Sequence, residues 1–259
     1  MLAGCAPVAA GGGGGIVSIN PCADAMLVRL VAPTRIGAIS RYSQDPSATS
    51  LPLAVARRFR VTAGTAEEVI ALRPALVLAS TFTAATTRDA YARAGLRTVY
   101  LDSPTTVAAS AAQVRQVAAA VGEQAKGDAM ARAIESSATL TRRSPGERNG
   151  EAAPRALLYI AGDLVNGGGT LLDELTRRAG FRNAAADYGL ANTGTLPTEL
   201  LVAHPPAVII ATGRGRTAAL RRSLLPTTPI ASFDRSLVNC GGPTIPAALA
   251  RLRAIRAAL

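Results

Sequence analysis

The segment "EEVIALRPALVLAS" at residues 67–80 decides the fold, because a variant of it, "ELLVAHPPAVIIAT", recurs at residues 199–212. The two segments lie 132 positions apart (199 minus 67), and five of their fourteen positions are identical. In each, a helical pattern that ends near a proline is followed by a short apolar run typical of a buried strand. The recurrence predicts two similar α/β lobes, since its period is far too long for a solenoid.

The rest of the chain alternates strand and helix patterns around these two units. Apolar or β-branched runs predict strands at residues 16–20, 35–40, 75–80, 97–103, 156–162, 207–212 and 235–239. Helical patterns fall at residues 23–33, 65–74, 87–95, 105–122, 167–180, 196–206, 217–225 and 245–259. Strands that alternate with helices favour parallel sheets covered by helices on both faces. The predicted fold class is α/β, with two Rossmann-like lobes built on parallel sheets.

One long helical pattern and one polar stretch separate the halves. Residues 123–143 predict a helix that would span about 30 Å at ~1.5 Å per residue. The stretch "SPGERNGEAAPR" that follows is rich in turn formers and is the best boundary in the chain. The expected organisation is a tether at 1–15, an N-terminal lobe at 16–122, a connecting helix at 123–143, a linker at 144–153 and a C-terminal lobe at 154–259.

The composition suits a folded body with a mildly basic surface. Hydrophobic residues make up 49% of the 259 residues, and the formal net charge is +11. All but one of the 28 basic residues are arginine, and they are scattered through every segment without a dense run. A solvated surface explains this pattern better than a nucleic-acid site, so no nucleic-acid partner is expected.

The N-terminal residues contain a short motif with a meaning of its own. Leu2-Ala3-Gly4-Cys5 resembles the bacterial lipobox, in which the cysteine is lipidated, and a glycine run follows it. This resemblance implies a lipidated Cys5 on a flexible, lipoprotein-type tether. The alternative is an Ala/Gly-rich tail with an incidental cysteine.

Several quoted segments, taken in order, resemble a known family. They are "IVSINPCADAMLVRL" at 16–30, "AEEVIALRPALVLAS" at 66–80, its counterpart in the second half, and "NCGGP" at 239–243. Over residues 16–259 the chain resembles the substrate-binding proteins of ABC importers, of the class (class III) that handles iron-siderophores, haem and vitamin B12. The resemblance implies two lobes joined by a single long helix, with the ligand in the cleft between them.

The same resemblance implies a biological setting. The expected protein is a monomeric, non-enzymatic, periplasmic or cell-envelope component that delivers a metal chelate to an ABC permease dimer in the inner membrane. The chelate (a ferric siderophore, haem or cobalamin) is cargo, so no intrinsic cofactor and no directly bound metal are expected. In this family a glutamate on each lobe docks on permease arginines, and the matching positions are Glu67 and Glu199. The alternative for each glutamate is a solvated residue in the first turn of a helix.

Ligands of open parallel sheets bind beyond the carboxyl ends of the strands. In the first lobe this rule selects Asn20, Cys22, Arg41, Tyr42, Ser80, Thr81 and Phe82, with Asp102 and Ser103 after the next strand. In the second lobe it selects Asp163, Asn166, Tyr188, Arg214, Asn239 and Cys240, with Thr212. The aromatic members suit a flat ligand, and the two arginines suit an anionic one. For any single position, an ordinary loop residue is the alternative.

Cys22 and Cys240 each follow a predicted strand, in different lobes, and both are expected to face the cleft. The oxidising setting of an exported protein would allow a disulfide between them that braces the lobes. Two separate buried thiols, or thiols that contact ligand, remain as alternatives at this point.

An enzyme is the principal competing interpretation, as a Rossmann-type enzyme or a two-lobed protein like the metal chelatases. The sequence contains few of the motifs that an enzyme would need. His204 is the only histidine, no G-x-S-x-G motif occurs, and "AGDLVNGGGTLL" at 161–172 does not fit G-x-G-x-x-G. A surface lipoprotein with a structural or adhesive role is a third interpretation, which leaves the two lobes unexplained.

Overall fold

The first lobe is built on a five-stranded parallel sheet. The computed structural model describes residues 14–138, 153–212 and 216–259. The strand order is β3-β2-β1-β4-β5, and every pair is parallel. The strands are β1 (Ile16–Ser18), β2 (Ile36–Ser40), β3 (Val61–Thr62), β4 (Leu76–Ser80) and β5 (Thr98–Leu101). The helices are α1 (Pro21–Leu30), α2 (Leu53–Ala56), α3 (Ala66–Ala71), α4 (Ala85–Arg93) and α5 (Val107–Val121).

The second lobe has its own sheet, with the order β11-β10-β6-β7-β9 and β8 beside β6. Its strands are β6 (Arg155–Ala161), β7 (Leu164–Val165), β8 (Arg182–Asn183), β9 (Gly194–Thr195), β10 (Val208–Ala211) and β11 (Ile230–Ser232). Its helices are α8 (Leu171–Arg178), α9 (Thr198–Ala203), α10 (Arg216–Leu224) and α11 (Ile245–Ala257). The predicted α/β class with two lobes is confirmed. One refinement is that β7 and β9 run antiparallel to their neighbours, so this sheet is mixed.

The two sheets are equivalent at the repeat found in the sequence. The unit α3–β4 corresponds to α9–β10, and both helices begin and end at positions 132 apart (198 minus 66, 203 minus 71). Strand β4 lies between β1 and β5, and β10 lies between β6 and β11, all in parallel. The repeated sequence therefore encodes a repeated structural unit.

Side chains that cap helix N-termini set where several helices begin. Thr65, Thr106 and Thr170 each accept a hydrogen bond from a backbone N–H in the first turn of α3, α5 and α8. Caps of this kind satisfy N–H groups that have no partner within the helix. At the other end, Gly122 ends α5 with φ of 76°, in the left-handed region that glycine tolerates.

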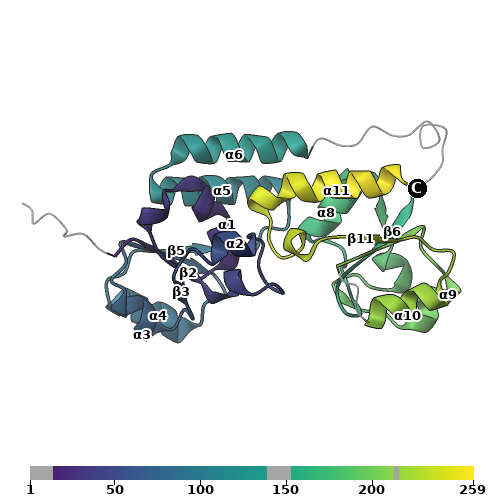
Figure 1. The fold of residues 1–259 in the computed structure, drawn as a ribbon, viewed down its shortest axis with the longest axis horizontal. Coiled ribbons are helices and arrows are strands. Elements are labelled where there is room, and N and C mark those ends of the chain that lie inside the picture. The colour runs from purple at the N-terminus through teal and green to yellow at the C-terminus, as the bar shows by residue number, and fades with distance from the viewer. Residues whose placement is uncertain (1–13, 139–152, 213–215) are drawn as a thin grey trace, which may run out of the picture.

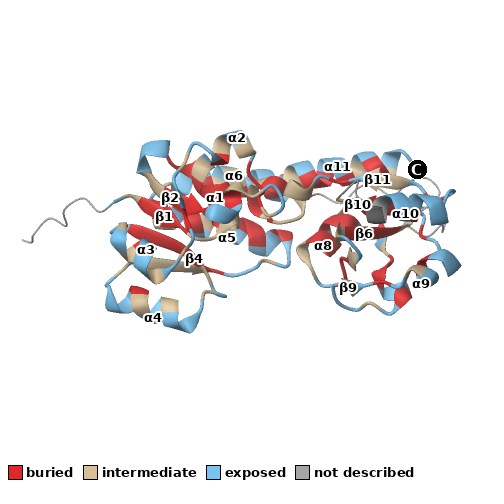
Figure 2. Cartoon of the chain, turned by 60° about the horizontal axis from the view of Figure 1, so that its bottom comes forward, coloured by how far each residue is buried: buried red, intermediate tan, exposed pale blue. Residues whose placement is uncertain are grey.

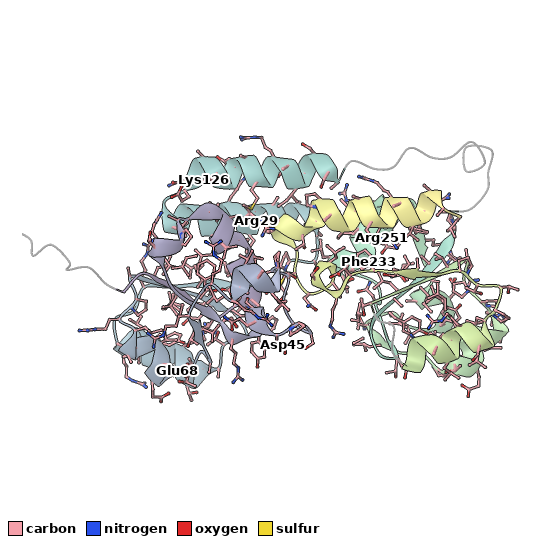
Figure 3. All side chains as sticks on the ribbon, viewed as in Figure 1. Arg29, Asp45, Glu68, Lys126, Phe233 and Arg251 are labelled. Carbon is pink, nitrogen blue, oxygen red and sulfur yellow. A yellow bond between two sulfur atoms is a disulfide. The ribbon has the colours of Figure 1, made fainter. Side chains whose placement is uncertain are left out.

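A layer of helices joins the lobes along one side of the molecule (Figure 1). Helix α6 (Gln124–Ser137) starts over the first lobe, where Lys126 donates to the carbonyl oxygen of Leu30 (Figure 3). Its end meets the second lobe, where Arg178 of α8 donates to Ala138 O at 2.7 Å. The connecting helix expected at 123–143 therefore begins at Gln124, and positions 139–143 lie outside the described residues.

Close packing of α6 on α5 depends on small residues. A Cβ atom built on Gly127 of α6 would lie 2.1 Å from the Cβ atom of Ala118 on α5. No larger side chain fits at that crossing without separating the two helices. Buried positions line the facing sides of this layer (Figure 2), and the largest hydrophobic cluster takes residues from both lobes, among them Leu27, Ile134, Leu158 and Leu249.

A second connection between the lobes lies away from the helix layer. The loop at 45–50 leaves the first lobe on the side that faces the second, where Asp45 lies (Figure 3). Arg235 donates from Nε to Ser47 O at 2.7 Å, and Ser50 donates to Ser236 O at 2.7 Å. The lobes are therefore held at two places.

The prediction of a strand at residues 235–239 is wrong. Residues Arg235–Leu237 form a 3-10 turn, because the Asp234 carboxylate accepts from the backbone N–H of Ser236 at 2.8 Å and bends the chain. The edge strand is β11, which lies just before this turn. The apolar residues Leu237 and Val238 pack against the main hydrophobic cluster instead of extending the sheet.

Candidate functional site

A cleft of about 500 Å³ lies between the two lobes. The first lobe contributes the start of α1, the ends of β4 and β5, and Tyr42, while the second contributes β6, α8 and the segment before α11. The volume is in the range of small-molecule sites. The lining residues are Ile19, Asn20, Pro21, Cys22, Met26, Tyr42, Ser80, Asp102, Ser103, Pro104, Gln113, Ile160, Asn166, Thr170, Leu171, Leu172, Leu175, Thr193, Leu237, Val238, Asn239, Cys240, Gly241 and Gly242.

Tyr42 enters the cleft from a 3-10 turn, Arg41–Gln44, that directly follows β2. Its side chain is 45% exposed, which leaves the phenol free to meet a ligand. The Arg41 guanidinium donates to Tyr42 Oη at 3.4 Å and lies 5.1 Å from the centre of the ring. The hydrogen bond to Tyr42 raises the pKa of Arg41, so this guanidinium keeps its charge. Arg41 itself is not a lining residue of the cleft.

The strand ends of the first lobe supply a polar patch. Ser80 accepts a hydrogen bond from the backbone N–H of Phe82 at 3.1 Å. Asp102 accepts from the Thr81 hydroxyl at 3.3 Å and from the backbone N–H of Ser103 at 2.8 Å. Ser80, Asp102 and Ser103 line the cleft, whereas Thr81 and Phe82 do not, and Phe82 is 76% exposed.

The floor of the cleft is a covalent junction between the lobes. Asn20 caps α1, because its Oδ1 accepts from the backbone N–H of Cys22 at 2.9 Å. The sulfur atoms of Cys22 and Cys240 are bonded, with a Cα–Cα distance of 5.2 Å, inside the range that disulfides require. Asn239 donates from Nδ2 to Thr49 O at 3.3 Å, so three of the selected residues hold the lobes together here.

In the second lobe the selected residues divide between the cleft and other places. Asn166 lines the cleft but is buried, and its Oδ1 accepts from the Thr170 hydroxyl at 3.0 Å. Asp163 is not a lining residue, and Arg221 of α10 pairs with it at 2.8 Å. Arg214 lies outside the described residues.

The placement of Tyr188 differs from the expectation. It lies at the end of a 3-10 turn, Ala185–Tyr188, and its ring is buried in the core of the second lobe with Leu157, Leu201 and Ile209. Its hydroxyl donates to His204 O. The expectation failed because a turn after a short strand can fold back under its own sheet, and an aromatic ring favours that apolar core.

The helix residues that line the cleft were not found from the sequence. They are Gln113 on α5 and Leu171, Leu172 and Leu175 on α8, with Gly241 packed close by. A Cβ atom on Gly241 would lie 2.6 Å from Leu171 Cδ2, so a larger residue there would displace the end of that side chain. The rule about strand ends cannot identify residues on helices, although the "NCGGP" segment was a usable signal for Gly241 and Gly242.

A buried carboxylate lies next to the cleft residues of α1. Asp24 has no exposed surface, and burial raises its pKa from 3.8 to about 7. Hydrogen bonds from the Ser43 hydroxyl and the backbone N–H of Ser40, and the nearby Ser18 hydroxyl, lower the pKa but do not offset the burial.

Glu67 and Glu199 are both exposed, in the first turn of the equivalent helices α3 and α9. These helices lie with α4 and α10 on the side of the molecule opposite to α5, α6 and α11 (Figure 1). The carboxylate of the neighbouring Glu68, by contrast, takes part in the local fold. It accepts hydrogen bonds from the Thr62 hydroxyl and from the backbone N–H of Ala63, both at 2.7 Å.

Two further properties of the described residues bear on function. They contain no group of three or more His, Cys, Asp or Glu residues placed to hold a metal ion. No helix within the described ranges has the length and apolar character needed to cross a membrane.

Comparisons with known proteins agree with the two-lobed architecture. The family model described as "Periplasmic binding protein" matches residues 16–230. None of the curated protein sequences matches the chain. The solved structure of the periplasmic haem-binding protein BhuT, in complex with two haems, is similar with a TM-score of 0.72 and 24% identity over 94% of this chain and 97% of that chain.

Two other solved structures are similar in the same way. A periplasmic haem-binding protein from Pseudomonas aeruginosa gives a TM-score of 0.71 and 22% identity over 93% of this chain and 91% of that chain. The periplasmic vitamin B12 binding protein BtuF of Vibrio cholerae gives 0.69 and 16% identity over 94% of this chain and 96% of that chain. At these identities the likeness concerns the fold. With two lobes, a cleft between them and a family match over most of its length, the chain belongs to the periplasmic binding protein family.

Proposed function

We propose that this protein captures a metal chelate, an iron porphyrin such as haem, in its cleft and delivers it to an ABC permease. The family supplies the coarser part of this statement, since its members are binding proteins and not enzymes, and their setting is the periplasm or cell envelope. The finer parts, the chelate and the permease, are proposals that rest on the residues below.

The observation that carries the proposal is the pairing of Tyr42 with Arg41 at the cleft. A phenolate oxygen is a hard ligand that suits ferric iron. The oxygen of Tyr42 accepts a hydrogen bond from the Arg41 guanidinium at 3.4 Å, which orients it. Arg41 does not line the cleft, but its guanidinium lies 5.1 Å from the centre of the Tyr42 ring, so a carboxylate of a ligand that reaches Tyr42 would come near a positive charge.

The remaining lining suits a flat apolar molecule. Ile19 and Met26 of the first lobe, and Leu171, Leu237 and Val238 of the second, supply apolar surface to the cleft. A pocket that is mostly apolar, with a few polar groups at one end, is typical of cofactor-sized ligands. Several solved relatives of similar fold are haem-binding proteins by name, which adds support for this class of ligand.

The test is a titration of purified protein with haemin, followed by visible absorbance. We expect saturable binding with about one haemin per protein and an absorption band from charge transfer between phenolate and iron. Tyr42→Phe should remove that band and weaken binding at least tenfold. Tyr100→Phe is the matched control, because the Arg88 guanidinium lies 4.8 Å from that ring but Tyr100 does not line the cleft.

Cobalamin and ferric siderophores are the other ligands to titrate in parallel. If one of them binds saturably and haemin does not bind, that ligand is the cargo in place of haem, and the proposed importer role is unaffected. Turnover of any of these ligands would favour the enzyme interpretation instead.

Delivery is proposed to use Glu67 and Glu199, one on each lobe, docked on basic residues of a two-fold permease. Two exposed carboxylates at equivalent positions of an otherwise basic protein can form such charge-assisted pairs. We further propose that the protein is a monomer and that Cys5, outside the described residues, carries a lipid anchor.

A further inference from the structure

The carboxylate of Asp24 is buried beneath the turn that carries Tyr42. Asp24 lies in the first half of α1 and has no exposed surface. Carboxylates are almost never fully buried without a specific set of partners, because burial costs the charged form its hydration. The partners of Asp24 therefore indicate what the residue does.

Both partners of Asp24 Oδ2 belong to the turn. This oxygen accepts from the backbone N–H of Ser40 at 2.9 Å and from the Ser43 hydroxyl at 2.6 Å. Ser40 and Ser43 flank Arg41 and Tyr42 on either side, so one oxygen atom fixes both ends of the segment. The Ser40 hydroxyl in turn accepts from the backbone N–H of Tyr42 at 3.3 Å.

The other oxygen of Asp24 has no such role. Oδ1 is buried and has no hydrogen-bond partner among the described residues. A neutral apolar side chain at this position would avoid that cost and would still fill the space between α1 and β2. The structural contribution that only an acceptor makes here is the pair of bonds to the turn.

We propose that Asp24 is a positioning residue for ligand capture, which fixes the 3-10 turn Arg41–Gln44 so that the Tyr42 phenol is held in the cleft. The inference rests on the proposed role of Tyr42 as the residue that meets the ligand. It adds that the geometry of this phenol is set by a side chain that does not line the cleft.

A first experiment measures the position of Tyr42 without any ligand. In protein labelled with ¹³C at the tyrosine ring, Tyr42→Phe identifies the resonance of Tyr42, and Tyr100 serves as the internal control. At pH 8 we expect Asp24→Leu, which has the same branched shape but no acceptor, to shift or broaden the Tyr42 resonance and to leave the Tyr100 resonance unchanged. An unchanged Tyr42 resonance in folded Asp24→Leu protein would overturn the proposal, whichever ligand the protein binds.

A second experiment measures the consequence for binding, with haemin as the probe. Asp24→Leu should weaken haemin binding about three- to tenfold and reduce the phenolate–iron absorption, and it should have no further effect in the Tyr42→Phe background. Equal losses in both backgrounds would mean that Asp24 supports the cleft in general, which would overturn the specific role. If Asp24→Leu does not fold, Ser43→Ala removes the 2.6 Å bond alone and should act in the same direction.

The two proposals fail in different ways. If Tyr42→Phe binds haemin as the unmodified protein does, the proposed function of Tyr42 is wrong, and the positioning role in ligand capture falls with it. If Tyr42→Phe loses affinity while both Asp24→Leu and Ser43→Ala keep it, only the positioning role is wrong.

Discussion

Cys22 in the first turn of α1 and Cys240 just before α11 are bonded to each other across 218 positions of sequence. The bond joins the first lobe to the second at the floor of the cleft. A crosslink that closes so long a loop restricts the unfolded chain and is expected to stabilise the fold by about 2–4 kcal/mol.

We predict that Cys22→Ser with Cys240→Ser lowers the free energy of unfolding by that amount, measured by urea titration. A reductant should destabilise the unmodified protein and leave the double variant unaffected. Equal sensitivity of both proteins to the reductant would contradict this account.

The docking proposal gives a prediction that separates transport from binding. Glu67→Ala with Glu199→Ala should abolish uptake of the ligand by cells that depend on this protein, because both charged contacts with the permease are lost. Ligand affinity of the purified double variant should be unchanged, since neither residue lines the cleft.

The matched control is Glu135→Ala, which removes an exposed carboxylate from α6 on the opposite side of the molecule. Its uptake should equal that of the unmodified protein. Normal uptake by the Glu67/Glu199 double variant would remove the docking assignment.

Asp24 predicts a particular dependence of stability on pH. Its pKa is raised from 3.8 to about 7 in the folded protein, mainly by burial. Between these values the folded state binds a proton that the unfolded state has lost, so this group's contribution to stability is complete below pH 3.8 and falls as the pH rises towards about 7. Over this range the free energy of unfolding should fall by a few kcal/mol, as an order of magnitude.

The comparison to make is with Asp24→Asn, which cannot titrate. As the pH rises from about 4 to about 7, the unfolding free energy of the unmodified protein should fall relative to that of Asp24→Asn. Urea titration of both proteins at each pH measures this difference. A difference that stays constant over this range would show that Asp24 has an ordinary pKa.

The contact between α5 and α6 predicts a pair of compensating substitutions. Gly127→Ala places a Cβ atom 2.1 Å from the Cβ atom of Ala118, so the helices must separate, at a cost of about 1–3 kcal/mol. Ala118→Gly removes the obstructing atom and should restore part of the lost stability when it is combined with Gly127→Ala. Thermal unfolding of the two single variants and the double variant measures this. No recovery in the double variant would show that the loss has another origin.

The sequence contained enough information for the lobes and their repeat. Apolar runs such as residues 76–80 and 208–211 are explained by burial in a parallel sheet. The hydrophobic pattern of the sequence was a weaker guide to the antiparallel strands of the second sheet. Strands β7 and β9 are two residues each, too short for any alternation to be visible.

The rule for strand ends located Asn20, Tyr42, Ser80 and Cys240 at the cleft, but it does not say which way a side chain points. Asp163 follows a strand as expected, yet it turns outward because Arg221 offers it an ion pair. Arg221 is buried over the ring of Tyr159, on a helix some sixty positions further along the chain, so no local signal revealed the pair. Contacts of this kind depend on the tertiary fold and are out of reach of a single sequence.

The shared hydrophobic cluster under α5, α6, α8 and α11 has a consequence for how the molecule comes apart. Either half, made alone, would present this apolar surface to water and would tend to aggregate. The two lobes therefore form one cooperative unit, and heat should melt them in a single transition, although each possesses a sheet of its own.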